Sequence, residues 1–379
     1  MITQINLRHF KCFELLKLPI SKLTLLSGSN ASGKSSVLQA LVLLHQTMRE
    51  HEWATRLILN GDSLKLGTVA DVVDKVHGRR SLEISIADDD TINRWFFSGE
   101  RSEMSMAVDR LEIGGFTEDK PKRLQYLHPY VEGREVPPLA KQLRSLTYIT
   151  AERIGPREFY PLEDPLVATV VGPAGEHAVS LLHIGRDDPV VDELQLEGIP
   201  PTRLRQVEAR MGTFFPGCGL AVEQVARANA VTLGIRTSEA TDYHRPIHVG
   251  FGLTQVLPIV VAALSAKQGD ILLIENPEVH LHPAGQALMG QFLASVANAG
   301  IQIIIESHSD HILNGIRRSI KSKDIEPEDV KLHYFRQPNH LDDQVVSPEI
   351  DKFGNIDKWP LGFFDQFDKD MNHFAGWEV

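Results

Sequence analysis

The stretch from Gly28 to Ser35, with the sequence GSNASGKS, constrains this chain more than any other. It fits the pattern G-x-x-x-x-G-K-[ST], which is typical of a phosphate-binding loop. Glycines allow the tight turn that aims backbone N–H groups at phosphate oxygens. Lys34 would reach the β- and γ-phosphates, and Ser35 would offer its hydroxyl to Mg²⁺. The helix that follows would point the positive end of its dipole at the anion.

The residues on either side of this loop supply the context that the motif requires. Leu23 to Leu26 is a short apolar run of β character, and Val37 to Leu44 is an apolar run that favours a helix. Strand, loop and helix therefore follow in the required order. The residues predicted to contact ATP here are Gly28, Ser29, Asn30, Ala31, Ser32, Gly33, Lys34, Ser35 and Ser36.

Composition narrows the class of protein. The chain has 379 residues, 42% of them hydrophobic, which allows one large α/β domain or two smaller ones. Its net charge of −11 argues against broad attraction to nucleic acid, although a local basic patch is still allowed. Cys12 and Cys218 form no disulfide framework. The start reads as a strand rather than a signal peptide, and no apolar run is long enough to span a membrane. We expect a soluble cytoplasmic protein with no membrane partner.

Strand-like patterns dominate the first third of the chain. Residues 1–27 alternate apolar and polar side chains in two bursts, which predicts a hairpin that leads into the phosphate-binding loop. Between 81 and 131, three further runs separated by turn residues read as strands, at 82–86, 94–97 and 104–108. They predict a β-rich insertion.

The next part of the chain is mixed. Residues 146–149 read as a strand, and the following loop carries Arg153 and Arg157. We expect salt bridges and loop packing from these arginines rather than contacts to phosphate or a partner. Residues 201–215 read as a helix whose arginines form no single stripe, so no nucleic-acid surface is predicted there.

Two apolar runs in the second half end in acidic residues. Asp270 to Glu275 reads as a buried parallel strand with a carboxylate at its tip, where it would hold Mg²⁺, commonly through water. Ile301 to Ile305 is a second buried strand, which ends in Glu306. A glycine-containing stretch lies before both strands and leads into an apolar helix. The N-terminus of this helix would be a second place suited to binding an anion. The stretch consists of Gly250, Phe251, Gly252, Leu253, Thr254 and Gln255.

Four histidines follow these strands in two tight clusters, at 280 and 282 and at 308 and 311. Such clusters can bind zinc, but the spacings are not specific. Each cluster also sits at a strand end, where a nucleotide site needs polar groups. The nucleotide site is therefore the preferred interpretation.

These motifs occur in an order that resembles the ABC-type ATPase heads of the RecF, SMC and overcoming-lysogenization-defect group. The resemblance covers roughly residues 1–75 and 245–365, and it includes LIENPEVHLHP at 273–283 and IESHS at 305–309. It implies an α/β fold with a mixed or parallel sheet core. The implied head consists of residues 1–75 and 246–336. The segment 76–245 would be a β-rich and then helical insertion between Walker A and the signature motif, and 337–379 a tail that packs on the head or a partner.

The resemblance also implies roles for single residues. Residues 28–36 would be Walker A, Glu275 the Walker B acid, residues 250–255 the signature motif, and residues 280–282 the D-loop region. His308 matches the switch histidine that senses the γ-phosphate. The implied metal ligands are Ser35 and Glu275, and the implied cofactors are ATP and Mg²⁺. In this group two heads sandwich two ATP molecules, so a homodimer or higher homo-oligomer is expected.

One residue departs from the group's pattern. The usual catalytic glutamate directly follows the Walker B acid, where this chain has Asn276. An amide cannot act as a general base near neutral pH. We therefore expect Glu278 or Glu306 to orient the attacking water, with Glu278 favoured. If neither does, hydrolysis would be slow and the protein would be an ATP-held switch.

Members of this group occur in bacterial anti-phage systems, which suggests a function. We expect a dimeric ATPase that regulates a separately encoded effector in anti-phage defence, and we expect that effector to be a nuclease. The alternative is a RecF-like ATPase that binds DNA in repair, for which the arginines and lysines at 317, 318, 321 and 323 are the best basic cluster. A transporter subunit fits poorly with the insertion and the tail.

Overall fold

The computed structural model describes residues 1–74, 78–133, 135–164, 170–337 and 343–375. Its centre is a sheet with the strand order β11-β15-β16-β3-β17-β18, in which all neighbours except β17 and β18 are parallel. The strands are β11 (Thr147–Ile149), β15 (Ile271–Glu275), β16 (Gln302–Glu306), β3 (Leu23–Gly28), β17 (Val330–Phe335) and β18 (Val345–Val346). The buried parallel strands predicted from apolar runs are thus confirmed. Because they are parallel, the ends of β3, β15 and β16 meet at one edge.

A second, antiparallel sheet stands beside the first. Its order is β2-β1-β5-β6-β7-β4, with β8 paired to β7. The strands are β1 (Ile2–Phe10), β2 (Phe13–Pro19), β4 (Arg56–Ile58), β5 (Ser81–Asp88), β6 (Ile92–Ser98), β7 (Ser105–Ile113) and β8 (Phe116–Asp119). The first predicted burst, at 2–7, is confirmed as β1, but the second, at 22–26, is β3 of the central sheet; the hairpin partner of β1 is β2, which the alternation did not indicate. The three predicted strands are confirmed as β5, β6 and β7.

The segment 76–245 contributes to both of these sheets. Its strand β5 pairs with β1, and its strand β11 forms the edge of the central sheet beside β15. The division of the chain at 76 and 245 stays a prediction. These pairings nevertheless join part of the segment to the N-terminal strands rather than leaving it as a separate body.

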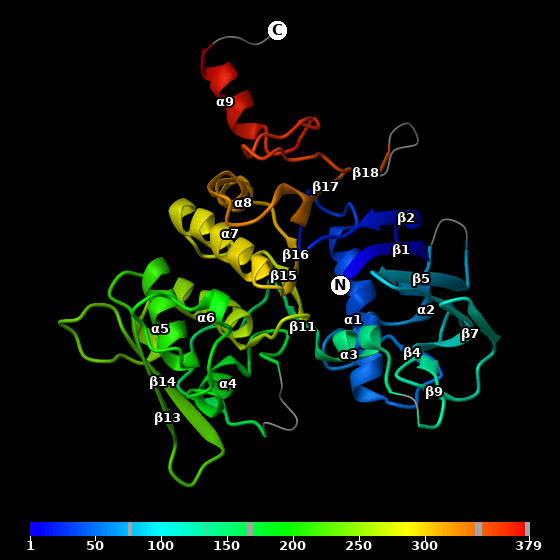
Figure 1. Ribbon diagram of the computed structural model, residues 1–379, viewed down its shortest axis with the longest axis horizontal. Coiled ribbons are helices and arrows are strands. Elements are labelled where there is room, and N and C mark those ends of the chain that lie inside the picture. The colour runs from blue at the N-terminus through cyan, green and yellow to red at the C-terminus, as the bar shows by residue number, and fades with distance from the viewer. Residues whose placement is uncertain (75–77, 134, 165–169, 338–342, 376–379) are drawn as a thin grey trace.

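Helix α1 (Lys34–Glu50) lies between the two sheets (Figure 1), and its apolar side chains share one core with both. A second core covers the opposite face of the central sheet. The helices that contribute to it are α4 (Ala178–Ile184), α5 (Arg203–Phe214), α6 (Phe251–Ser265), α7 (Pro283–Asn298) and α8 (Asp310–Ser322). The predicted helix at 201–215 is confirmed as α5.

Smaller elements complete the described chain. A three-stranded sheet β12-β14-β13 packs beside α4 and α5, and β9 and β10 form a short hairpin. Their bounds, with those of the remaining helices, are β9 (Leu124–Gln125), β10 (His128–Pro129), β12 (Tyr160–Pro161), β13 (Gly219–Gln224), β14 (Ala230–Arg236), α2 (Val69–Val72), α3 (Pro138–Ser145), η1 (Asp192–Leu194), η2 (Pro246–His248), η3 (Pro327–Asp329) and α9 (Gln366–Ala375).

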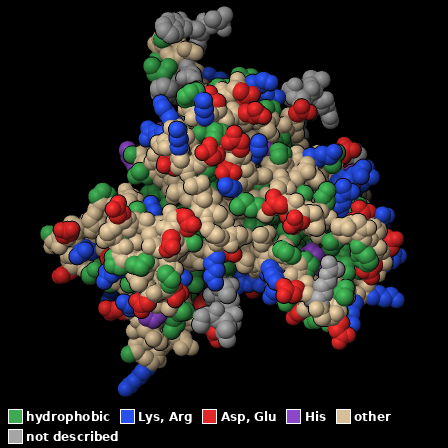
Figure 2. Space-filling model, viewed as in Figure 1, with side chains coloured by type: hydrophobic (Ala, Val, Ile, Leu, Met, Phe, Trp, Pro, Cys, Tyr) green, Lys and Arg blue, Asp and Glu red, His purple; other side chains and the backbone are tan. Residues whose placement is uncertain are grey.

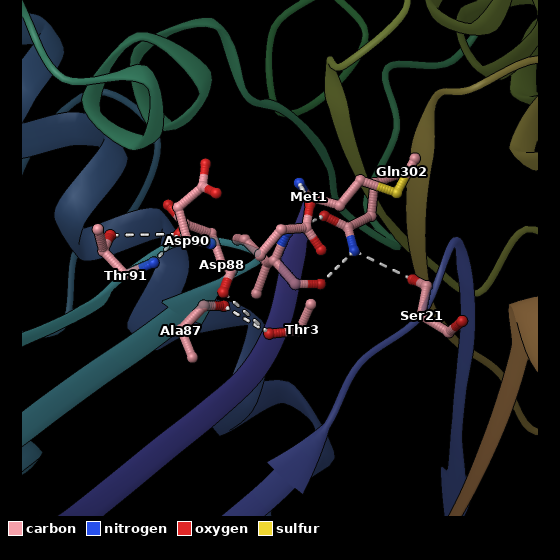
Figure 3. Close-up of polar contacts among 10 residues, drawn as sticks. Met1, Thr3, Ser21, Ala87, Asp88, Asp90, Thr91 and Gln302 are labelled. Carbon is pink, nitrogen blue, oxygen red and sulfur yellow. Dashed lines mark hydrogen bonds and ion pairs between the residues drawn. The ribbon is translucent and has the colours of Figure 1, made fainter.

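A buried glutamine ties the two large sheets together (Figure 3). The side chain of Gln302, at the start of β16, accepts from the N–H of Ile2 and donates to the carbonyls of Ile2 and Ser21. Gln302 is buried, so these bonds satisfy polar groups that would otherwise be costly to bury. They fix the start of β1 against the sheet that carries the phosphate-binding loop.

The C-terminal segment packs on α8 and β17 before α9 projects from the body at the top of Figure 1. Phe363 is buried and its ring makes an edge contact with Tyr334, at 5.3 Å between ring centroids. Arg317 of α8 donates from Nε to the carbonyl of Gly354 at 2.6 Å and lies over the ring of Trp359. Arg317 is therefore engaged by the tail, which takes it out of the basic cluster predicted on α8.

Figure 2 shows acidic and basic side chains interspersed over the face in view. No helix within the described ranges is both long and apolar enough to cross a membrane.

Candidate nucleotide site

The phosphate-binding loop joins the end of β3 to the start of α1, as the motif predicts. Gly28 has φ +137°, and a Cβ there would lie 2.0 Å from the carbonyl oxygen of Phe335. Gly33, the N-cap of α1, has φ +105° and sits against the ring of Phe13 and the thiol of Cys12. Only glycine tolerates both the conformation and the lack of space. The sequence therefore folds the loop tightly at both of its glycines.

A cavity of about 390 Å³ opens in front of this loop. Its wall combines the loop with residues from β16 and from the segment after it. The lining residues are Lys11, Cys12, Asn30, Ala31, Ser32, Gly33, Lys34, Ser35, Ser36, Gln39, Glu306 and His308. The N-terminus of α1 faces this space, so its free N–H groups and dipole favour an anion there.

Lys34 brings its charge into the loop. Its Nζ donates to the carbonyls of Gly28 and Ser29, at 3.1 and 2.7 Å, and lies 4.0 Å from a carboxylate oxygen of Glu306. The side chain is only 3% exposed. Burial lowers the pKa of Lys34, and the nearby Glu306 partly offsets this.

Glu306 is the acid in contact with the loop. The hydroxyl of Ser35 donates to its Oε1 at 3.0 Å, whereas its buried Oε2 has no hydrogen-bond partner among the described residues. Burial is the main cause that raises the pKa of Glu306; the bond from Ser35 lowers it, while the charge of Glu275 raises it further. The acid that contacts Ser35 is thus Glu306.

Glu275, the predicted Walker B acid, faces the edge strand of the sheet instead. Its carboxylate accepts from the Tyr148 hydroxyl at 2.7 Å and from the N–H of Ala151 at 3.3 Å. It does not line the described wall of the cavity. Glu275 does not contact Ser35, and its role as the acid that holds Mg²⁺, commonly through water, stays a prediction.

Asn276 adopts a left-handed conformation, with φ +43°. Its N–H donates to the carbonyl of Glu306 at 2.8 Å, and its own carbonyl accepts from Arg153. Arg153 also donates to the carbonyl of Glu275 at 3.0 Å, and burial lowers its pKa to about 10. Arg153 was expected to make a salt bridge and loop contacts; in the structure it instead holds the C-terminal end of β15 through the carbonyls of Glu275 and Asn276.

Glu278 lies beneath the segment that follows β16. Its two carboxylate oxygens accept from the Ser307 hydroxyl and from the N–H of His308, both at 2.9 Å. Burial raises its pKa, while these hydrogen bonds oppose the rise. Glu278 was the residue expected from the sequence to orient water. The geometry favours Glu306, because Glu306 lines the cavity and Glu278 holds His308 in place.

His308 lines the cavity close to Lys34. Burial, and to a lesser degree the charge of Lys34, lowers its pKa and so favours the neutral imidazole. A neutral imidazole has one N–H to donate to a phosphate oxygen. This position agrees with the switch role that the resemblance implies.

The predicted signature residues stand at the start of α6, away from the cavity of their own chain. Gly250 is the N-cap, and a Cβ on Gly252 would lie 2.8 Å from the carbonyl oxygen of His280. Gln255 is buried and donates to the carbonyls of Arg153 and Ile154. None of residues 250–255 is among the described residues that line the cavity.

The four histidines do not gather into a zinc site. His280 packs against the ring of Phe251, His282 accepts from the N–H of Ala284 at the start of α7, and His308 lines the cavity. Within the described ranges, no group of three or more His, Cys, Asp or Glu is placed to hold a metal ion.

Comparison with known families decides the class of protein. Residues 1–127 and 230–313, more than half of the chain, match the AAA ATPase domain family. The chain belongs to this family. A second family, a protein of unknown function (DUF3696), matches residues 325–373 of the AAA ATPase. The search of curated proteins found no match to this chain.

The fold of this AAA ATPase is similar to that of solved SMC heads. One, an Smc head bound to the C-winged helix domain of ScpA, is 13% identical, with a TM-score of 0.51 over 93% of this chain and 98% of that chain. Another, derived from Pyrococcus furiosus, has an extended coiled coil and is bound to the C-terminal domain of ScpA. It is 11% identical, with a TM-score of 0.54 over 99% of each chain. The AAA ATPase thus has the fold of these SMC heads, and as a member of its family it is an enzyme that hydrolyses ATP.

Proposed function

We propose that this AAA ATPase is a switch in which two copies close on bound ATP and hydrolysis opens them. The observation that carries the proposal is the separation of two predicted binding elements. The phosphate-binding loop, Glu306 and His308 share one cavity, whereas residues 250–255 line none of it in the same chain. A second copy that presents its own Gly252 to this cavity would complete the site.

The residues present fit Mg²⁺. Ser35 and Glu306 offer a hydroxyl and a carboxylate oxygen 3.0 Å apart, and hard oxygen ligands of this kind are what the ion prefers. Ser35 and Glu306 would hold it, with Glu275 behind them. When bound there, the ion would neutralise charge on the phosphate oxygens.

The side chains of the cavity then have separate tasks. Lys34 and the N-terminus of α1 bind the phosphates, and His308 donates to the terminal phosphate. Oε2 of Glu306 has no partner among the described residues and is free to orient the attacking water. The raised pKa of Glu306 makes this carboxylate a better proton acceptor than an exposed glutamate. Glu278 acts indirectly, by positioning His308.

We further propose that the closed form regulates a separately encoded effector, a nuclease, in anti-phage defence. This part rests on the resemblance of the sequence motifs to members of defence systems. The test is to purify the tagged protein with the products of adjacent genes, with and without MgATP. An effector that co-purifies in a nucleotide-dependent way supports the proposal. ATPase activity that is stimulated by DNA, with steep salt dependence, would instead favour a RecF-like repair function.

A further inference from the structure

The C-terminal segment touches the phosphate-binding loop from outside the cavity. β17 lies parallel to β3, and its last carbonyl, that of Phe335, accepts from the N–H of Ser29 at 3.1 Å. Close by, the side-chain nitrogen of Gln344 donates to the carbonyl of Ser32 at 3.1 Å. We propose that Gln344 is a positioning residue for ATP binding, which turns the N–H of Gly33 toward the phosphates.

The orientation of the Gln344 side chain follows from its neighbours. The carbonyl oxygen of Ser32 can only accept a hydrogen bond, so the amide nitrogen of Gln344 must face it. The thiol of Cys12 lies 3.7 Å from the same nitrogen. The main chain of Gln344 is itself held, because its carbonyl accepts from the N–H of Arg336 at 2.9 Å.

Because the peptide bond is planar, the contact with the Ser32 carbonyl also sets the direction of the Gly33 N–H. A trans peptide is planar, and its C=O and N–H point in opposite directions. The bond from Gln344 fixes the C=O of Ser32 on the outside of the loop. It therefore fixes the N–H of Gly33 on the other side, where Gly33 lines the cavity. The N–H groups of Ala31, Ser32 and Gly33 donate to no group among the described residues, which leaves them to an anion.

The orientation of the Ser32–Gly33 peptide depends on a contact from outside the loop, because the backbone of Gly33 has little conformational preference of its own. Gly33 has φ +105°, and glycine populates positive and negative φ about equally. The Ser32–Gly33 peptide can therefore turn over at little conformational cost. A single hydrogen bond of ordinary strength is enough to decide which way it points.

The inference rests on the nucleotide cavity and not on the dimer or the effector. Gln344 lies in the C-terminal segment that matches a family of unknown function, and the inference assigns this part of the segment a role in nucleotide binding. The phosphates nearest the loop are present in both ATP and ADP. Loss of the Gln344 contact should therefore weaken both nucleotides alike and leave the chemical step unchanged.

The experiment is isothermal titration calorimetry of MgATP and MgADP with Gln344→Leu and Gln344→Glu, alongside steady-state turnover. Neither replacement offers an N–H donor. We expect Kd for both nucleotides to rise about three- to tenfold, as the loss of one neutral hydrogen bond implies. We expect kcat at saturating ATP and the melting temperature without nucleotide to stay close to those of the parent.

The matched control is Gln195→Leu. Gln195 also donates to a loop carbonyl, that of Val190, at 2.8 Å, but it follows Leu194 of the other core and is not among the residues that line the cavity. We expect parent-like affinity from it. Unchanged affinity in both Gln344 variants, or a loss confined to ATP, would overturn the inference. A parent protein that binds neither nucleotide would instead refute the cavity assignment itself.

Discussion

The hydroxyl of Ser35 donates a 3.0 Å hydrogen bond to Glu306, on the strand next to β3. Glu275 stands in register with Glu306, but one strand further away, and bonds to Tyr148. The strand order therefore decides which of two acids at the same sheet edge reaches the phosphate-binding loop. It makes Glu306 the acid that contacts Ser35.

Replacing Glu306 tests its role in the chemical step. Glutamine keeps an oxygen that can accept from Ser35 but cannot take a proton, so we expect Glu306→Gln to lower kcat by about 10²- to 10⁴-fold. ATP affinity, measured by calorimetry, should change little. Glu275→Gln is the control, with a smaller expected effect on turnover. A near-normal Glu306→Gln beside an inactive Glu275→Gln would show that the acid has been misassigned.

Glu278 should affect the reaction through His308. Its carboxylate accepts from both Ser307 and the N–H of His308, and Gln in its place keeps only one accepting oxygen. We expect Glu278→Gln to lower kcat about tenfold or more by misplacing His308, with ATP affinity retained. His308→Ala combined with Glu278→Gln should be no slower than His308→Ala alone. Fully additive losses would mean that Glu278 acts independently of His308.

Three buried histidines should make the fold sensitive to acid. Burial lowers the pKa of each of His45, His128 and His333 to about 4, whereas a histidine in the unfolded chain has a pKa of about 6.5. The unfolded chain then binds more protons between these values, so stability is complete above about pH 6.5 and falls as the pH drops toward 4. A pKa shift of this size at one histidine changes the free energy of unfolding by about 3 kcal/mol between the two pH values.

The measurement is urea unfolding of the parent and of His333→Gln across this pH range. His333 is held by the Ser347 hydroxyl and the carbonyl of Pro19, so the variant should be less stable at pH 7. Its loss of stability between pH 6.5 and 4 should, however, be smaller than that of the parent. Parallel curves for the two proteins would show that His333 does not titrate as described.

Local patterns predicted the elements of this fold well. The apolar runs at 270–275 and 301–305 became β15 and β16, because a buried parallel strand needs little else in its sequence. The phosphate-binding loop was equally readable, since its glycines are imposed by contacts with Phe335 and Phe13 that no other residue would allow.

Long-range pairing was what the sequence could not supply. Nothing in the residues around Glu306 or Glu275 says that β16 lies between β15 and β3, and that order sets which acid meets Ser35. The contact of Gln344 with Ser32 spans 312 positions of sequence, and one glutamine in a tail carries no local signal. Arg153 was visible, but its acceptors are backbone carbonyls, which sequence patterns do not reveal.

The mass of the ATP complex in solution is the most direct test of whether two copies close on ATP. Glu306→Gln should bind ATP and hydrolyse it slowly, so it can be held in the ATP state during sedimentation velocity analysis. With MgATP we predict a species of at least twice the mass of the chain, which returns to the single chain when ADP replaces ATP. A single chain at saturating MgATP, with ATP shown to be bound, would contradict the account.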